Sequence, residues 1–71
     1  MYRFDAGDKV IVTIIGGRRV SGVVVAQEMD GAKPLVVGGA FRYRVDVAPE
    51  GKPCCGVHVL APQLELVEAF G

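Results

Sequence analysis

The chain has 71 residues, of which 51% are hydrophobic and 23% are charged, and its formal net charge is zero. This length suits one small domain over residues 1–71 and is too short for two. The chain is too apolar to be intrinsically disordered, and its apolar runs are far shorter than the roughly 20 residues that span a bilayer. Zero net charge gives no general attraction for nucleic acid or an anionic membrane. We therefore expect one folded domain and no membrane partner.

The two cysteines, Cys54 and Cys55, are adjacent in the sequence. A disulfide between them would close almost no loop, so it would remove little entropy from the unfolded chain. The residues from Met1 to Asp5 also lack the apolar core of a signal peptide. Both observations favour a cytoplasmic protein. Stability must come from packing, and because a core this small supplies only about 3–5 kcal/mol, oligomerisation is a common supplement.

The first half of the chain predicts two strands joined by a turn. Residues 9–15 form the first strand, with Val10, Val12 and Ile14 on its core face. Gly16 and Gly17 supply a hairpin turn, because glycine tolerates the positive φ angles that such turns need.

The second strand covers residues 19–27. Gly22 within it suggests a bulge or a sharp bend, as small barrels need where a strand turns a corner. Residues 30–34 (DGAKP) form a loop by their turn chemistry.

Residues 41–47 give the clearest strand, since apolar and polar side chains alternate along them at period two. The core face then carries Phe41, Tyr43, Val45 and Val47, and the outer face carries Arg42, Arg44 and Asp46. Residues 49–53 (PEGKP) form the next loop. A fourth strand at 57–60 places His58 and Leu60 on one face. One tight helical turn at 61–63 precedes a last strand at 64–67. The fold class is all-β, with five short strands and one helical turn before the last.

Residues 4–10 (FDAGDKV), the pair Gly16–Gly17, residues 20–24 (VSGVV) and residues 64–67 (LELV) together resemble the SH3-like β-barrel of the KOW and Tudor type. In those families a Gly-Asp-x-Val start leads into a hairpin, and a glycine follows in the second strand. The resemblance implies a five-stranded SH3-like barrel in which Asp8 is exposed and Val10 enters the core. It implies no particular function, because this barrel hosts many unrelated activities.

Residues 4–10, 20–25 and 57–60 (VHVL) also resemble the type II dihydrofolate reductases, which are small plasmid- and cassette-borne enzymes with this barrel. In that family four subunits surround one central pore that binds NADPH and dihydrofolate. The family has glutamine, isoleucine and tyrosine where this chain has His58, Val59 and Leu60. The lysine that attracts the anionic ligands in that family corresponds to Val12 in this chain. The resemblance therefore implies the fold and a tendency to associate, without the family's catalytic residues.

Cys54, Cys55 and His58 lie within five residues and are all possible zinc ligands. A structural zinc site needs four ligands, usually from two separated pairs, and the sequence has no second cluster. We therefore expect reduced thiols and neither a metal nor another cofactor, with a strained vicinal disulfide as the alternative. His58 has a side chain suited to acid–base chemistry, but no serine, cysteine or carboxylate forms a recognisable catalytic set with it. We expect no catalytic residues and a surface or interface histidine.

Four of the five arginines fall into two pairs, Arg18 with Arg19 and Arg42 with Arg44. Arginines beside aromatic residues can contact RNA phosphates and bases. Eight acidic residues balance the eight basic ones, and Asp46 is in line with the second pair. A solvated, salt-bridged sheet face is the favoured interpretation, and nucleic-acid binding stays open as the alternative.

The strand pattern leaves more apolar side chains than one small barrel can bury. A contiguous exposed apolar patch on a small domain usually marks an interface. The sequence predicts a homo-oligomer whose interface contains Ile11, Ile15, Val23, Val25 and Leu60. The alternative is that the second strand bends at Gly22 and one subunit covers both faces.

These features favour a non-enzymatic binding or assembly module of SH3-like fold. Its ligand or partner surface would comprise the hairpin arginines, the loop from Asp30 to Gly39 and the strand around His58, with a protein or a small anionic ligand as partner. The residues of that surface are Arg18, Arg19, Arg42, Arg44, His58 and Leu60. The alternatives are an NADPH-dependent or ligand-binding relative of the type II dihydrofolate reductases and an RNA-binding KOW-type domain.

Overall fold

Short antiparallel strands dominate the computed structural model, which describes residues 4–47 and 56–69. In chain order the strands are β1 (Lys9–Thr13), β2 (Arg19–Gln27), β3 (Met29–Asp30), β4 (Lys33–Pro34), β5 (Val36–Val37), β6 (Ala40–Val47), β7 (Gly56–Leu60) and β8 (Leu64–Glu68). Two 3-10 turns, η1 (Ile15–Gly17) and η3 (Ala61–Gln63), complete the described elements. The prediction of an all-β chain is confirmed. None of the described helical segments has the length and apolarity needed to cross a membrane.

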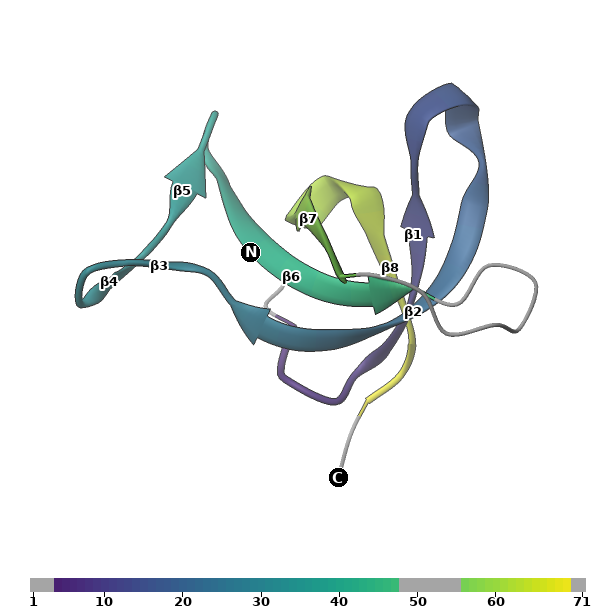
Figure 1. Cartoon of the computed structure of the whole chain (residues 1–71), viewed down its shortest axis with the longest axis horizontal. Coiled ribbons are helices and arrows are strands. Elements are labelled where there is room, and N and C mark those ends of the chain that lie inside the picture. The colour runs from purple at the N-terminus through teal and green to yellow at the C-terminus, as the bar shows by residue number, and fades with distance from the viewer. Residues whose placement is uncertain (1–3, 48–55, 70–71) are drawn as a thin grey trace.

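The strands form one main antiparallel sheet in the order β8–β1–β2–β6. The beginning of β6 also pairs with β5, and residues 42–46 of β6 pair with β7. The sheet curves strongly, with the β1–β2 hairpin projecting at one end and the β3–β4 hairpin at the other (Figure 1). Within the described residues β7 and β8 each pair with a single neighbour, so the ladder of hydrogen bonds does not close into a barrel.

The core lies on the concave face of this sheet and is built by alternation. Along β1, Val10 and Val12 are buried while Lys9 and Thr13 are exposed. β6 repeats the pattern, with Tyr43 fully buried on the predicted face. The core residues are Phe4, Val10, Val12, Val20, Val24, Tyr43, Val45, Val47, Val59 and Leu64.

Four of the five predicted strands occupy nearly the predicted residues, which the period-two burial of their side chains explains.

The first strand is shorter than predicted. It ends at Thr13, and Ile14 is only half-buried against the core. The connection to β2 is wider than a two-residue turn, because the Ile14 amide donates to the Arg18 carbonyl at 2.8 Å and η1 lies between them. Gly16 and Gly17 both have positive φ angles, of 84° and 77°, as the glycine pair predicts. Ile15 is fully exposed at the tip.

Gly22 does not form a bulge, which was one of the two roles predicted for it, the other being a sharp bend. It is buried and in register, opposite Val10 on one side and Val47 on the other. A Cβ atom at this position would lie 2.8 Å from Val45 Cγ1. The glycine is therefore needed for close packing. The irregularity in β2 falls between Val24 and Ala26 instead, three residues further along.

Asp8 is buried, contrary to the expectation that it is exposed; only 3% of its surface is accessible. The reason is local. Its carboxylate turns back and accepts the Asp5 amide at 2.9 Å, while the Asp8 amide donates to the Asp5 carbonyl. The same turn is attached to β2, because the Asp8 carbonyl accepts the Val24 amide at 2.9 Å.

The segment between β2 and β6 is more ordered than the predicted loop. Met29 and Asp30 pair with Pro34 and Lys33 to form a small hairpin. At its base three backbone hydrogen bonds form a ring. Glu28 N–H donates to the Arg42 carbonyl, Leu35 N–H to the Glu28 carbonyl, and Arg42 N–H to the Leu35 carbonyl, at 2.9, 2.9 and 3.1 Å. We call residues 28–42 the arm.

The end of the chain matches its prediction closely. The 3-10 turn at Ala61–Gln63 lies where one helical turn was predicted, between β7 and β8. Gln63 fixes it in place, because its Oε1 accepts the Leu60 amide at 3.0 Å and its Nε2 donates to the Thr13 carbonyl at 3.2 Å. The predicted loop at 49–53 and the two cysteines lie outside the described residues.

Candidate functional site

The outer, convex face of the sheet carries an apolar hollow of about 240 Å³. Gly22 on β2 is one of its lining residues, although its Cβ position faces Val45 and the core on the other side of the sheet. Side chains of β1, β2, β6 and β8 surround it. The lining residues are Lys9, Val10, Ile11, Ser21, Gly22, Val23, Asp46 and Val67. We call this the outer hollow.

Three of its residues lie in one row across the sheet. Val23 on β2 is opposite Lys9 on β1 and opposite Asp46 on β6. Neighbouring strands are about 4.8 Å apart, so the row places a cation and an anion on either side of an exposed valine, with Val23 42% accessible. The outer hollow is therefore apolar at its centre and oppositely charged at its two sides.

The predicted interface residues are only partly brought together. Ile11 and Val23 both line the outer hollow, and Val25 is exposed further along β2. Ile15 lies instead at the tip of the β1–β2 hairpin. Leu60 is half-buried and lies opposite Arg42 at the β7 edge, two strands away from β2. The five residues do not form one patch.

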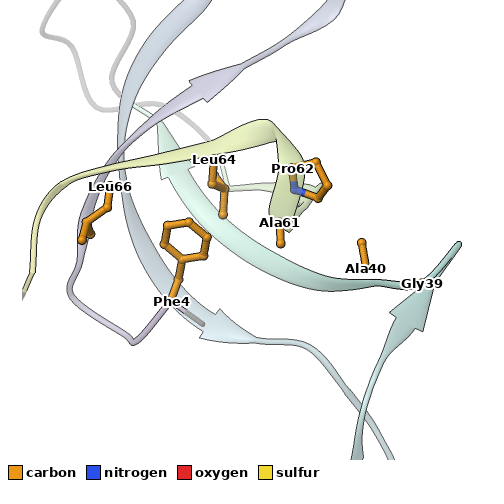
Figure 2. A pocket seen from close by; sticks show the side chains of 7 residues that line it. All are labelled: Phe4, Gly39, Ala40, Ala61, Pro62, Leu64 and Leu66. Atoms are coloured by element: carbon orange, nitrogen blue, oxygen red, sulfur yellow. The ribbon is translucent and has the colours of Figure 1, made fainter. Parts of the chain in front are cut away.

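A second, larger cavity of about 420 Å³ opens on the concave side. It lies between the start of β6, the turn η3 and the N-terminal segment, and Figure 2 shows the Phe4 ring beside Leu64 and Leu66. The lining residues are Phe4, Gly39, Ala40, Ala61, Pro62, Leu64 and Leu66. All of these side chains are apolar or absent, so the cavity offers shape and apolar surface but no side chain for acid–base or nucleophilic chemistry.

His58 and Arg42, two predicted site residues, meet on the same carboxylate. Glu28 Oε2 lies 2.6 Å from Arg42 Nε, and Glu28 Oε1 contacts His58 Nδ1. The Glu28 side chain is 21% accessible, less than either partner. The cluster ties the start of the arm to β6 and β7. The contact with Glu28 gives His58 a structural role.

The remaining arginines are dispersed. Arg19 forms an ion pair with Glu65 across β1. Arg44 is exposed on the outer face, opposite His58, and Arg18 is exposed beside the hairpin turn. The structure therefore does not gather the four predicted arginines into one basic patch, and Arg19 and Arg42 already contact carboxylates.

Among residues 4–47 and 56–69, no group of three or more histidine, cysteine, aspartate or glutamate side chains could hold a metal ion. The ligand set considered from sequence depended on Cys54 and Cys55, which lie outside those residues.

Sequence reasoning missed Val67, Lys9 and Glu28. Val67 could have been found, because Leu64 and Leu66 alternate inward and leave Glu65 and Val67 on the outer face. Lys9 could also have been found, because alternation along its strand places it on the outer face. Glu28 has none, since its role depends on two strands that are distant in the sequence.

No family model, curated protein or solved structure matches this chain.

Proposed function

We propose that the chain is a non-enzymatic assembly module that works as a homo-oligomer and associates through the outer hollow. The observation that carries this is the apolar opening on the convex face, which Ile11, Val23 and Val67 line. Val23 and Val67 are 42% and 61% accessible. Covering such a patch releases water from apolar surface, which is the main driving force of association.

The finer fold belongs to the same proposal. We assign an SH3-like barrel whose ladder of hydrogen bonds is open between β7 and β8, supported by the order β8–β1–β2–β6–β7 and by the 3-10 turn before β8. Such barrels serve as scaffolds for varied binding functions. Here the convex face provides the contact.

The test is the mass in solution by light scattering after gel filtration, under reducing conditions. Wild type is expected to be an oligomer. Val23→Gln places a polar amide in the outer hollow without changing the charge, and it is expected to weaken self-association by about tenfold or more, as loss of a central apolar contact does. The matched control is Ile15→Gln at the exposed hairpin tip, which is expected to associate like wild type. A monomeric wild type would contradict the proposal.

The alternative is a relative of the type II dihydrofolate reductases, supported by the resemblance at residues 4–10, 20–25 and 57–60. Val12 and Val59 are buried in the core, and His58 contacts Glu28, so this alternative needs its positive charge from an exposed arginine such as Arg44. NADPH fluorescence on addition of protein distinguishes the two functions. No change at high protein concentration excludes the enzyme, whereas a saturable change supports it.

An RNA-binding role is the other alternative. It is weakened by the ion pairs of Arg19 with Glu65 and of Arg42 with Glu28, because these guanidinium groups would have to leave carboxylates to contact phosphates. Binding of a mixed single-stranded RNA at low salt, where phosphate contacts are strongest, would support the RNA-binding role.

A further inference from the structure

The row Lys9–Val23–Asp46 has a symmetry property that specifies how two copies can meet. Charge along it runs from positive on β1, through an apolar centre on β2, to negative on β6. A contact between identical surfaces must be complementary to itself. This row meets that condition for one orientation of the two-fold axis and not for the other.

Consider first an axis that lies between the two facing sheets and runs along β2. It exchanges the two sides of β2, so β1 of one copy faces β6 of the other. Lys9 then lies over Asp46 of the second copy, and Asp46 over its Lys9. Val23 meets its own symmetry mate at the centre. An axis at right angles to β2 in the same plane would instead place Lys9 over Lys9 and Asp46 over Asp46, which opposes association.

We propose that two copies of this chain pack face to face at the outer hollow, with the two-fold axis along β2 and reciprocal pairs between Lys9 and Asp46. The inference rests on the proposed function and adds the geometry of the contact. The occupant of the outer hollow is thus a second copy, selected by the charge complementarity of the row with itself.

The local surroundings of both charges are compatible with this contact. The Lys9 ammonium lies 3.7 Å from Glu68, and both side chains are mostly exposed, at 64% and 70% accessible. Such an exposed pair is weak, so Lys9 can turn toward a second carboxylate. Asp46 forms no ion pair with any residue of the described chain, although Arg44 lies two residues away on the same face. Opposite Asp46 on β7 is Gly56, so β7 adds no side chain of its own there, and the ends of the Arg44 and Asp46 side chains lie over this glycine.

The experiment uses charge reversal in the full chain. In the proposed dimer, Lys9→Glu places a glutamate opposite each Asp46, and Asp46→Lys places a lysine opposite each Lys9. Each single variant is expected to self-associate about tenfold or more weakly than wild type at low salt, and the deficit should shrink as salt screens the charges. Sedimentation velocity gives the dissociation constants.

Mixing supplies the decisive readout. Lys9→Glu and Asp46→Lys chains combined in one tube have two attractive pairs across the proposed contact. They are expected to form heterodimers, which native mass spectrometry resolves because the two chains differ in mass. The double variant K9E/D46K is expected to self-associate like wild type, since both pairs are present with reversed sign.

The outcomes separate this inference from the proposed function. If Val23→Gln disrupts the oligomer but both single reversals associate as wild type does, the outer hollow is the interface and the proposed axis is wrong. An axis across β2 predicts that result, because each reversal would then only exchange one like-charge pair for another. If Val23→Gln has no effect, the proposed function fails first.

Discussion

Phe4 and Tyr43, 39 positions apart in the sequence, are joined by both backbone and ring contacts. The Phe4 amide donates to the Tyr43 hydroxyl at 3.3 Å, and the two rings meet edge to face with centroids 5.5 Å apart. Both residues are buried. The pair anchors the segment before β1 to the middle of β6.

Tyr43→Phe tests the hydroxyl by itself. The ring contact stays, and the loss of the hydrogen bond is expected to lower the free energy of unfolding by about 1 kcal/mol. Urea denaturation followed by circular dichroism measures it. Tyr43→Leu also removes the aromatic pair, and its cost should exceed that of Tyr43→Phe. Equal costs would mean that the edge-to-face contact adds nothing.

Gly22→Ala should be strongly destabilising for a single methyl group. The new Cβ would meet Val45 Cγ1 at 2.8 Å and the Asp46 carbonyl oxygen at 3.0 Å. Both neighbours belong to β6, so the strands must separate, and we expect a loss of about 1–3 kcal/mol from overpacking. Thermal unfolding gives the comparison.

The matched control is Gly56→Ala on β7. A Cβ there meets Arg44 Nε at 3.1 Å and Asp46 Oδ1 at 3.2 Å, which are the ends of exposed side chains that can move. Gly56→Ala should therefore unfold within a few degrees of wild type. If the two variants were equally stable, the close approach at Gly22 would not be the reason for its glycine.

Asp8→Ala is expected to destabilise the turn before β1. It removes the acceptor of the Asp5 amide, a hydrogen bond to a charged group that contributes about 1.5–3 kcal/mol. Asp8→Asn keeps one side-chain oxygen and should recover part of the loss. Hydrogen exchange at the Asp5 amide provides a local readout, and unchanged protection in Asp8→Ala would contradict the assigned contact.

Glu28→Gln should loosen the base of the arm with little effect elsewhere. The substitution removes the charge that Arg42 and His58 share. Because all three side chains have access to solvent, the cost is expected to be small, about 0.5–1 kcal/mol, and to diminish at high salt. Limited proteolysis within residues 28–42 should become faster. Glu65→Gln on β8, which removes the separate ion pair with Arg19, is the control and should leave that cleavage rate unchanged.

The strands could be predicted because burial imposes a visible period on them. Tyr43 and Val45 are buried and Arg44 is exposed, as the alternation in residues 41–47 requires. What failed depends on contacts between distant segments. The burial of Asp8 follows from a turn attached to Val24, and the in-register Gly22 follows from Val45. Neither neighbour is visible from the local pattern.

The candidate site divides in the same way. Ile11 and Val23 could be assigned to an outer face by counting along their strands. That they lie beside Val67, with Lys9 and Asp46 on either side of Val23, could not be predicted from the sequence. It depends on how β1, β2 and β6 pair in the sheet. Alternation also assigns Ile15 and Leu60 to the outer face, but Ile15 lies at the hairpin tip and Leu60 on the edge strand β7. Alternation predicts which face a side chain is on and not where in the sheet it lies.

The ring of three hydrogen bonds that joins Glu28, Leu35 and Arg42 has a consequence for protein engineering. It closes the arm at its base, so the register of β2 with β6 does not depend on the length of the hairpin from Met29 to Pro34. A foreign peptide can replace the turn at Gly31 and Ala32, both exposed, with its two ends held by the β3–β4 pairs. This small chain thus offers a display scaffold whose graft point is on the arm, away from the outer hollow.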